Sequence, residues 1–383
     1  MKRVAMLMSG GVDSSVAAAL LKEQGFEVIG FYILGWLGTP DFPCPWQKEE
    51  QDARKVADQL GIPFHTINLS KEYERDVIDR FFAGYQAGVT PNPDILCNRE
   101  IKFKALWQKI RQFEPDYIAT GHYAKTIQNP KAKNQNGGIF KPKDSNKDQT
   151  YFLWGIEKNI LPKIIFPLGE LTKPEVRALA KKYQLATATK KDSQGICFIG
   201  PLKVRQFLAS RLRTLPGDVF LADGRRVASH NGVELYTIGQ RLAAGSVDWT
   251  GDVPPLFVIA KDVQHNRLIV GSDAETMATE LTAGQANWQG SKPLDFSCGK
   301  PQGEFAALAK IRYRQEDVPA TITLSGDKLS VKFRAPVRAI TPGQSIVFYS
   351  EKEQLLGGAI IESVKNQDET IKRLTPAQSP AQV

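Results

Sequence analysis

Cys97 lies in surroundings that favour a reactive thiol. It belongs to PNPDILCNREIKF, residues 91–103, in which prolines fix the chain before the expected start of a helix. Arg99, Lys102 and Lys104 follow it closely. Nearby positive charge and a helix N-terminus both favour the thiolate, which is the nucleophilic form of cysteine. Cys97 is therefore a candidate nucleophile.

The segment SQGICFIG, residues 193–200, holds a second candidate thiol. Cys197 lies there between two apolar residues, and the glycines on either side predict a loop that can move a reactive sulfur. A free cysteine taken alone is more often a small buried hydrophobic residue, and Cys44 and Cys298 keep this interpretation. The four cysteines contain no CxxC pair, which argues against a structural zinc site and a secreted disulfide scaffold.

The motif MSGGVDSSV, residues 8–16, predicts a phosphate-binding loop between a strand and a helix. Its glycines let several backbone N–H groups point to one place, and the helix N-terminus adds positive potential. Its serines add hydroxyl donors. It matches neither GxxxxGK[ST] nor GxGxxG, so a different nucleotide chemistry is indicated. The simpler alternative is that the two glycines only make a tight turn.

Alternating apolar strands and amphipathic helices must position these residues. We expect strands near 3–8, 27–33, 64–69 and 117–120, and helices over 12–24 and 49–60. This alternation predicts an α/β fold with a doubly wound parallel sheet, in which ligands bind beyond the carboxyl ends of the strands.

Beyond residue 202 the chain changes to short β-rich runs. Asp223-Gly224, Asn231-Gly232 and Ser325-Gly326-Asp327 each separate two such runs, as hairpin turns do. Runs such as ATITLSGDKLSVKF predict a barrel. We expect an α/β catalytic domain over 1–202, a small mainly β domain over 203–276, a C-terminal β-barrel over 277–365 and a disordered tail over 366–383.

The composition narrows the class of protein. A chain of 383 residues with 42% hydrophobic content exceeds what one core usually supports. The formal net charge of +9 favours a polyanionic partner, although many basic enzymes bind no nucleic acid. The apolar start is too short for a signal peptide, and no later run reaches membrane-spanning length. We expect a soluble cytoplasmic protein without membrane contact.

The phosphate loop and the flanks of both cysteines resemble the bacterial tRNA-specific 2-thiouridylases, the MnmA/TrmU family of the PP-loop ATP pyrophosphatase superfamily, over about residues 1–362. The resemblance implies that ATP adenylates the 2-carbonyl oxygen of the tRNA wobble uridine. Sulfur from a cysteine persulfide then replaces that oxygen, giving 2-thiouridine, AMP and pyrophosphate. In this family Cys97 is the nucleophile and Cys197 carries the persulfide. Cys97 either liberates sulfide or forms a disulfide with Cys197, and both variants require the two thiols to approach each other.

The same resemblance assigns ligand contacts. Mg²⁺ would accompany ATP near Asp13 rather than occupy a site held by the protein. The ATP-binding residues are Leu7, Met8, Ser9, Gly10, Gly11, Val12, Asp13, Ser14, Ile33 and Gly121. Asn92, Pro93 and Asp94 would contact the target base, which must leave its stack to be modified. The tRNA-binding residues are His122, Lys147, Asp148, Gln149, Arg312, Tyr313 and Gln344.

Simpler structural roles compete with some of these assignments. His122 taken alone also fits a satisfied structural histidine, and Arg312, Tyr313 and Gln344 also fit an exposed barrel rim. The partners implied by the resemblance are tRNAs for Lys, Glu and Gln, and a cysteine desulfurase or sulfur-relay protein that supplies the persulfide.

Three rival functions remain at this stage. A PP-loop enzyme that transfers nitrogen to a small molecule, as argininosuccinate or GMP synthetases do, would need no paired cysteines. An iron–sulfur tRNA thiolase would need three or more cluster-binding cysteines, and that spacing is absent from the sequence. A noncatalytic RNA-binding protein would not need ATP or Cys97, and the intact SGGVDSS loop argues against it.

Overall fold

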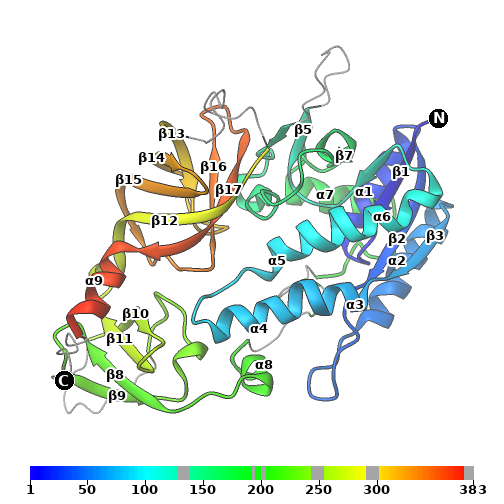
Figure 1. The fold of residues 1–383 in the computed structure, drawn as a ribbon. Coiled ribbons are helices and arrows are strands. Elements are labelled where there is room, and N and C mark those ends of the chain that lie inside the picture. Colours follow the sequence, from blue (N-terminus) through cyan, green and yellow to red (C-terminus); the bar gives the residue numbers. More distant parts are fainter. Residues whose placement is uncertain are drawn as a thin grey trace.

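The computed structural model describes residues 1–127, 138–191, 195, 197, 199, 204–242, 254–289 and 302–374. They form a parallel α/β sheet with its helices, a smaller four-stranded sheet and a closed barrel (Figure 1). Cys298 and most of the loop around Cys197 lie outside the described residues. Within the described ranges, no helix combines the length and the apolar character that crossing a membrane requires.

The N-terminal sheet is parallel, with the strand order β3-β2-β1-β4-β7. Its strands are β1 Arg3–Leu7, β2 Glu27–Leu34, β3 Phe64–Asn68, β4 Tyr117–Ala119 and β7 Ile164–Ile165. The chain winds outward from β1 through β2 and β3, then returns to place β4 on the other side of β1. The point where the strand order reverses opens a crevice at the carboxyl ends of β1 and β4. The predicted doubly wound sheet is confirmed.

Helices cover both faces of this sheet, which explains its continuous apolar strands. Val4 and Met6 of β1 pack on one face, while Ala5 and Leu7 pack on the other. The first face is covered by α1 Val12–Glu23, α2 Trp46–Leu60 and α7 Lys173–Lys182. The second is covered by α3 Ser70–Tyr73, α4 Asp79–Gln86, α5 Pro93–Leu96 and α6 Leu106–Ile110, with π-helical turns at Glu74–Ile78 and Cys97–Ala105.

The middle sheet is mixed and has the strand order β10-β11-β8-β9. Its strands are β8 Gly217–Leu221, β9 Arg226–His230, β10 Phe257–Asp262 and β11 Arg267–Gly271, preceded by α8 Val204–Arg211. The Asp223-Gly224 hairpin is confirmed, because β8 and β9 pair antiparallel around it. The Asn231-Gly232 hairpin is wrong. Gly232, with φ 125°, leads into a short 3₁₀ turn, and its N–H donates to Nδ1 of His230.

The C-terminal domain is a closed barrel with the strand order β12-β15-β14-β13-β16-β17. Its strands are β12 Met277–Trp288, β13 Gln302–Lys310, β14 Val318–Ser325, β15 Lys328–Arg338, β16 Ser345–Tyr349 and β17 Leu355–Val364. Side chains along β14 and β15 alternate between buried and exposed, as one filled barrel face requires. The predicted barrel and the hairpin at Ser325-Gly326-Asp327 are confirmed.

The predicted disordered tail is wrong for residues 366–374, since Lys365–Leu374 forms helix α9. The buried Gln367 side chain donates to the carbonyl of Ile340 at 2.8 Å, and Asn366 donates to the carbonyl of Met277 at 3.0 Å. Ile371 and Leu374 pack on the middle sheet. The polar composition suggested disorder, but a few anchored side chains tie α9 to the barrel and to the middle sheet. Residues 375–383 lie outside the described part of the chain.

Candidate active site

The loop after β1 folds back on the first turn of α1. Ser14 Oγ donates to the carbonyl of Gly11 at 3.1 Å and accepts from the backbone nitrogen of Ser9, also at 3.1 Å. Gly10 has φ +69°, and a Cβ there would lie 2.2 Å from the carbonyl oxygen of Glu49 in α2. A Cβ on Gly121, after β4, would lie 2.8 Å from the backbone nitrogen of Ser14. These glycines let α2 and the β4 loop pack tightly around the start of α1.

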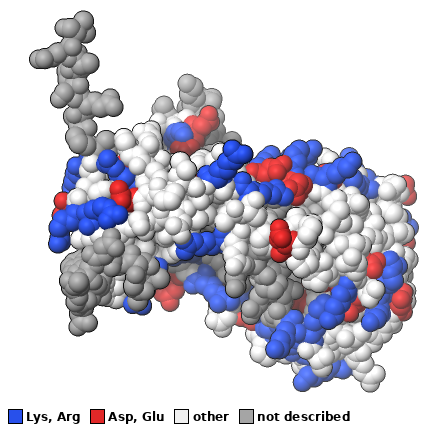
Figure 2. Space-filling view, turned by 90° about the horizontal axis from the view of Figure 1, so that it is seen from below, with Lys and Arg blue, Asp and Glu red and all other residues white. Residues whose placement is uncertain are grey.

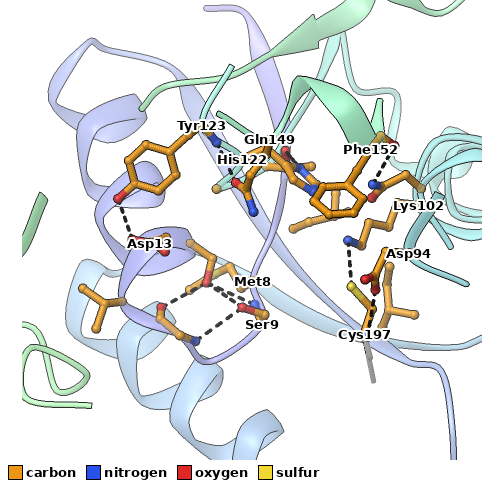
Figure 3. A pocket seen from close by; sticks show the side chains of 18 of the residues that line it. Met8, Ser9, Asp13, Asp94, Lys102, His122, Tyr123, Gln149, Phe152 and Cys197 are labelled. Carbon is orange, nitrogen blue, oxygen red and sulfur yellow. Dashed lines mark hydrogen bonds between the residues drawn. The ribbon is translucent and has the colours of Figure 1, made fainter. Parts of the chain in front are cut away.

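A cavity of about 730 Å³ opens in front of this loop (Figure 3). It lies at the carboxyl ends of β1 and β4, where the topology predicts a ligand crevice. Nine of the ten predicted ATP-binding residues line it, namely Leu7, Met8, Ser9, Gly11, Val12, Asp13, Ser14, Ile33 and Gly121. Gly10 does not line it and serves the packing against α2 instead. The start of α1 also lacks a side-chain cap among the described residues, so its first N–H groups are available to an anion.

Asp13 is held by two partners from other elements. Its Oδ1 accepts from the hydroxyl of Tyr123 at 2.9 Å and from Nζ of Lys173, at the start of α7, at 2.6 Å. Figure 3 shows Tyr123 reaching across to Asp13. A carboxylate that is already paired binds a further cation less strongly than a free one. The positive charge nearest to Asp13 is that of Lys173, and a phosphate bound there would meet this charge.

Cys97 and Cys197 meet at the cavity wall, with Cys197 on its surface and Cys97 buried behind it. The helix begins at Pro93, with the Asn92 side chain as its cap, so Cys97 follows its first turn instead of lying at its start. The predicted activation of Cys97 by the helix N-terminus therefore loses its geometric basis. Cys97 is fully buried, whereas Cys197 is half-buried and lines the cavity. The described cysteines Cys44, Cys97 and Cys197 form no disulfide in this structure.

Polar contacts from three helices hold Cys197. Its Sγ lies 3.7 Å from Nζ of Lys102, and its backbone nitrogen donates to Asp94 at 3.1 Å (Figure 3). Its carbonyl accepts from the Tyr73 hydroxyl at 2.5 Å. A hydrogen bond with Cys97, burial and the charge of Asp94 raise the pKa of Cys197 well above its usual range, against the opposing charge of Lys102. That hydrogen bond agrees with the expected approach of the two thiols.

His122 lies beside Lys102 on the cavity wall. Its Nδ1 pairs with the hydroxyl of Thr120 at 2.7 Å, and its ring packs near Phe103 and Phe166. Burial, followed by the charge of Lys102, lowers the pKa of His122 well below its usual value. A neutral imidazole results, which can hydrogen-bond but offers no positive charge to a phosphate.

The predicted target-base residues occupy the turn before Cys97. Asp94 lines the cavity, whereas Asn92 and Pro93 do not. Asn92 caps α5 and approaches Gln344 of the barrel at 3.5 Å. Gln344 in turn donates to the carbonyl of Thr90 at 2.7 Å. Asn92 and Gln344 are 252 positions apart in the chain, and both were predicted to contact ligands. Their contact joins the barrel to the turn that precedes Cys97.

The KDQ segment lies between the cavity and the barrel. Lys147 and Gln149 line the cavity, and the Gln149 side chain accepts from the backbone nitrogen of Tyr123 at 2.8 Å. Asp148 is only 4% exposed, and its carboxylate binds Thr150 and Nζ of Lys310 in β13. Its side chain thus faces the domain interface instead of the surface.

The barrel supplies one wall of the cavity through the loop after β13. Tyr313 lines it, with its ring 4.8 Å from that of Phe152. Arg314 lines it too, with its guanidinium 5.9 Å from the Tyr313 ring. Arg312 points elsewhere and donates to the carbonyl of Ala339 at 2.9 Å. An aromatic pair beside a cation is a surface on which a nucleobase can stack.

Comparison with known proteins decides the family. Residues 2–201 match the model described as tRNA methyl transferase HUP domain, 205–272 the tRNA methyl transferase PRC-barrel domain, and 278–361 the aminomethyltransferase beta-barrel domain. The chain is 46% identical to the tRNA-specific 2-thiouridylase MnmA of Streptococcus sanguinis, covering 95% of this chain and 96% of that protein. It is 45% identical to the protein of the same name in Lactococcus lactis subsp. lactis, covering 94% of each.

The chain belongs to the MnmA family of tRNA-specific 2-thiouridylases. The predicted family is thus confirmed, and the chain is an enzyme of this kind. A solved 4-thiouridine synthetase–RNA complex with bound ATP aligns with 55% of this chain and 50% of that chain, at 19% identity and a TM-score of 0.36.

Several residues that line the cavity of this MnmA-family chain were not predicted from the sequence. They are contributed by segments whose meeting depends on the tertiary fold: Phe31, Tyr32, Glu49, Asn98, Thr120, Tyr123, Phe152, Lys191 and Arg314. Lys102 was noted only as a charge near Cys97, although its ammonium contacts Cys197. One signal was readable beforehand, since Asn92 followed by proline is a typical helix start and would have placed Cys97 after the first turn.

Proposed function

We propose that this chain is an ATP-dependent tRNA-uridine 2-sulfurtransferase that converts the wobble uridine to 2-thiouridine, releasing AMP and pyrophosphate. One observation carries the proposal: a single cavity of about 730 Å³ is lined both by the SGGVDS loop and by Cys197, with Cys97 hydrogen-bonded behind it. Anion-binding backbone and one thiol in a shared cavity, with a second thiol buried beside it, match a reaction that consumes ATP to place sulfur. The relatives named tRNA-specific 2-thiouridylases support the same reaction.

The residues of the first loop fit a nucleotide. The open N–H groups of Val12, Asp13 and Ser14 suit phosphate oxygens, and Ile33 and Tyr32 on the cavity wall suit an apolar ring. Lys173 adds positive charge beside Asp13. Mg²⁺ would arrive with ATP, because the Asp13 carboxylate is already shared by two partners. ATP supplies the activation of the uracil 2-carbonyl oxygen, which otherwise leaves poorly.

The two cysteines would divide the sulfur chemistry. Cys197 is the candidate persulfide carrier because it lines the cavity, whereas the buried Cys97 can reach only its neighbour. The outer sulfur on Cys197 would attack C2 of the activated uracil, and the C2–O bond would break with AMP as the leaving group. Cys97 would then attack Cys197 Sγ, forming a Cys97–Cys197 disulfide and releasing the 2-thiouridine, and an external thiol would reduce this disulfide before the next cycle. In the alternative, Cys97 would attack Sγ of the loaded Cys197 first, forming the same disulfide and releasing sulfide, which then attacks C2.

Binding of tRNA would use the cavity mouth and the barrel. Asp94 is available to the extruded base, with Asn92 and Pro93 shaping its turn. His122, Lys147, Gln149 and Tyr313 line the same cavity, and Asp148, Arg312 and Gln344 support its walls. On the face in Figure 2, basic side chains are spread widely among fewer acidic ones, in line with the net charge of +9. A polyanion fits such a surface.

The expected partners follow from this reaction. They are tRNAs for Lys, Glu and Gln, and a cysteine desulfurase or relay protein that loads sulfur onto Cys197, all in the cytoplasm. The decisive experiment incubates wild type, Cys97→Ser and Cys197→Ser with ATP, Mg²⁺, unmodified tRNA for Lys, cysteine desulfurase and cysteine. Nucleoside mass spectrometry should find 2-thiouridine only with the wild type. Pyrophosphate release with a small-molecule acceptor and no 2-thiouridine from the wild type would refute the proposal.

A further inference from the structure

The contact between Lys102 and Cys197 has no part in the chemistry described so far. Lys102 Nζ lies 3.7 Å from Cys197 Sγ, across 95 positions of the chain (Figure 3). Lys102 shares the π-helical segment Cys97–Ala105 with the other cysteine, yet its ammonium group contacts Cys197. π-Helical turns often mark functional sites, because they change which side chains face one another.

We propose that Lys102 stabilises negative charge on the Cys197 sulfur and thereby makes Cys197, rather than Cys97, the carrier of the transferred sulfur. The stabilisation of negative charge on Cys197 does not depend on any assigned reaction. The role of Cys197 as sulfur carrier rests on the proposed function.

The groups around Cys197 leave Lys102 as its compensating cation. The titratable neighbours that face it are Cys97, Asp94 and Tyr73, with His122 beside Lys102. Cys97 and Asp94 oppose ionisation of the Cys197 thiol, because both raise its pKa. Burial lowers the pKa of Lys102, but the nearby Cys197, Cys97 and Asp94 outweigh it and raise that pKa above the usual value. Lys102 therefore stays protonated, while the low pKa of His122 leaves that ring neutral.

Access and charge select the same cysteine. Cys97 is 0% exposed, so a donor protein has no route to its sulfur in this state. Cys197 lines the cavity, and a second sulfur would extend from it by an S–S bond of about 2.05 Å. The flexible lysine stem carries a compact charge with three donors, which can follow the charge from Sγ to the outer sulfur. Asp94 and Tyr73 hold the peptide of Cys197 while this happens.

The first test measures the acidity of Cys197 directly. In a Cys97→Ala background, which removes the hydrogen-bond partner that does most to raise the pKa of Cys197, the rate of Cys197 alkylation by iodoacetamide is followed from pH 6 to 11 by peptide mass spectrometry, which separates it from the other cysteines. Lys102→Met should raise the midpoint by about one pH unit or more and slow alkylation about tenfold near neutral pH. Lys102→Arg should stay near the parent. Lys104→Met is the matched control on the same segment, because Lys104 pairs with Glu100 instead.

An unchanged midpoint in folded Lys102→Met, with a rate within twofold of the parent, overturns the proposal. Lys102→Gln replaces it if the methionine variant shows no cooperative thermal transition. The second test uses the two-cysteine protein loaded by a cysteine desulfurase with cysteine, and it locates the sulfane sulfur by persulfide tagging. Lys102→Met should lower the Cys197 persulfide at least fivefold, and unchanged loading overturns the carrier role. A wild type that makes no 2-thiouridine refutes the proposed function, while the alkylation profile still decides the role of Lys102.

Discussion

The Asp94 carboxylate accepts a hydrogen bond of 3.1 Å from the backbone nitrogen of Cys197, which lies 103 positions later in the chain. Asp94 belongs to α5, the short helix directly before Cys97, so this bond brings the loop of one cysteine to the helix of the other. It also occupies a carboxylate that the resemblance assigns to the target base. Asp94 thus has two possible partners, the amide of Cys197 and the base.

The first prediction separates the hydrogen bond of Asp94 from its charge. Asp94→Asn keeps an oxygen that can accept from the Cys197 amide, whereas Asp94→Ala leaves the loop without this anchor. We expect single-turnover thiolation to fall less than about tenfold in the asparagine variant. We expect it to fall about 100-fold in the alanine variant, because misplacing a reacting group by about 1 Å costs that much. Equal losses in both variants would show that the charge matters and the anchor does not.

The second prediction concerns Gly10. Its φ is +69°, and a Cβ at this position would lie only 2.2 Å from the Glu49 carbonyl oxygen, which leaves no room for a side chain. Gly10→Ala should lower the free energy of unfolding by more than about 1 kcal/mol, because a left-handed backbone and a backbone clash both penalise alanine. Gly11→Ala is the matched control, since Gly11 has φ −93° and its Cβ would meet only Ser9 Oγ at 3.4 Å. Urea unfolding measures both, and equal midpoints for the two variants would contradict this explanation.

Local patterns predicted the sheet well because its strands are buried on both faces. The apolar runs at Arg3–Leu7 and Glu27–Leu34 leave little alternative to parallel strands, and Gly61 ends α2 in the left-handed conformation that glycine favours. Turn chemistry was less reliable. Asn231-Gly232 resembles a hairpin turn, yet the bond from Gly232 to the His230 ring directs the chain into a 3₁₀ turn.

The walls of the cavity were harder to predict than its floor. The residues of the SGGVDS loop are consecutive, so the motif can be recognised directly in the sequence. Tyr313 and Phe152 meet only because the barrel docks on the catalytic domain, and no local pattern encodes that docking. The same holds for α9, whose polar composition hides the anchoring role of Gln367.

The third prediction concerns the ion pair that holds the KDQ segment against the barrel. Lys310 lies 3.1 Å from Asp148 and 3.5 Å from Asp317, and all three side chains are less than a fifth exposed. Lys310→Met should lower the free energy of unfolding by about 3–5 kcal/mol, because it leaves the buried Asp148 carboxylate without its cation, whereas Asp317 keeps its pair with Lys141. Adding Asp148→Asn should restore part of this loss.

A matched control for this pair lies on the barrel surface. Lys328 pairs with Glu362 at 2.5 Å, with 63% of the lysine side chain exposed. Lys328→Met should cost less than about 1 kcal/mol. Chemical denaturation of the wild type, Lys310→Met, Asp148→Asn and the double variant gives the coupling energy of the interface pair. A loss for Lys310→Met as small as that for Lys328→Met would mean that solvent already screens the interface pair.

The last prediction is a pH dependence of stability caused by His122. Burial and the charge of Lys102 lower its pKa well below 6.5 in the folded state, while the unfolded chain titrates near 6.5. Below about pH 6.5 the unfolded state binds more protons at this position, so the free energy of unfolding must fall as the pH falls. The slope from this group reaches at most about 1.4 kcal/mol per pH unit, and above about pH 6.5 the group contributes none.

His122→Asn isolates this contribution from that of other groups. Burial also lowers the pKa of His230, so the wild type has a second source of the same slope. Subtracting the stability of His122→Asn from that of the wild type at each pH removes His230, since both proteins retain it. The difference should be flat from pH 7 to 8 and should decrease steadily from pH 6.5 to 5. A difference that is constant over the whole range would mean that His122 is protonated as easily in the folded state as in the unfolded chain, which would contradict the lowering of its pKa by burial and by the charge of Lys102.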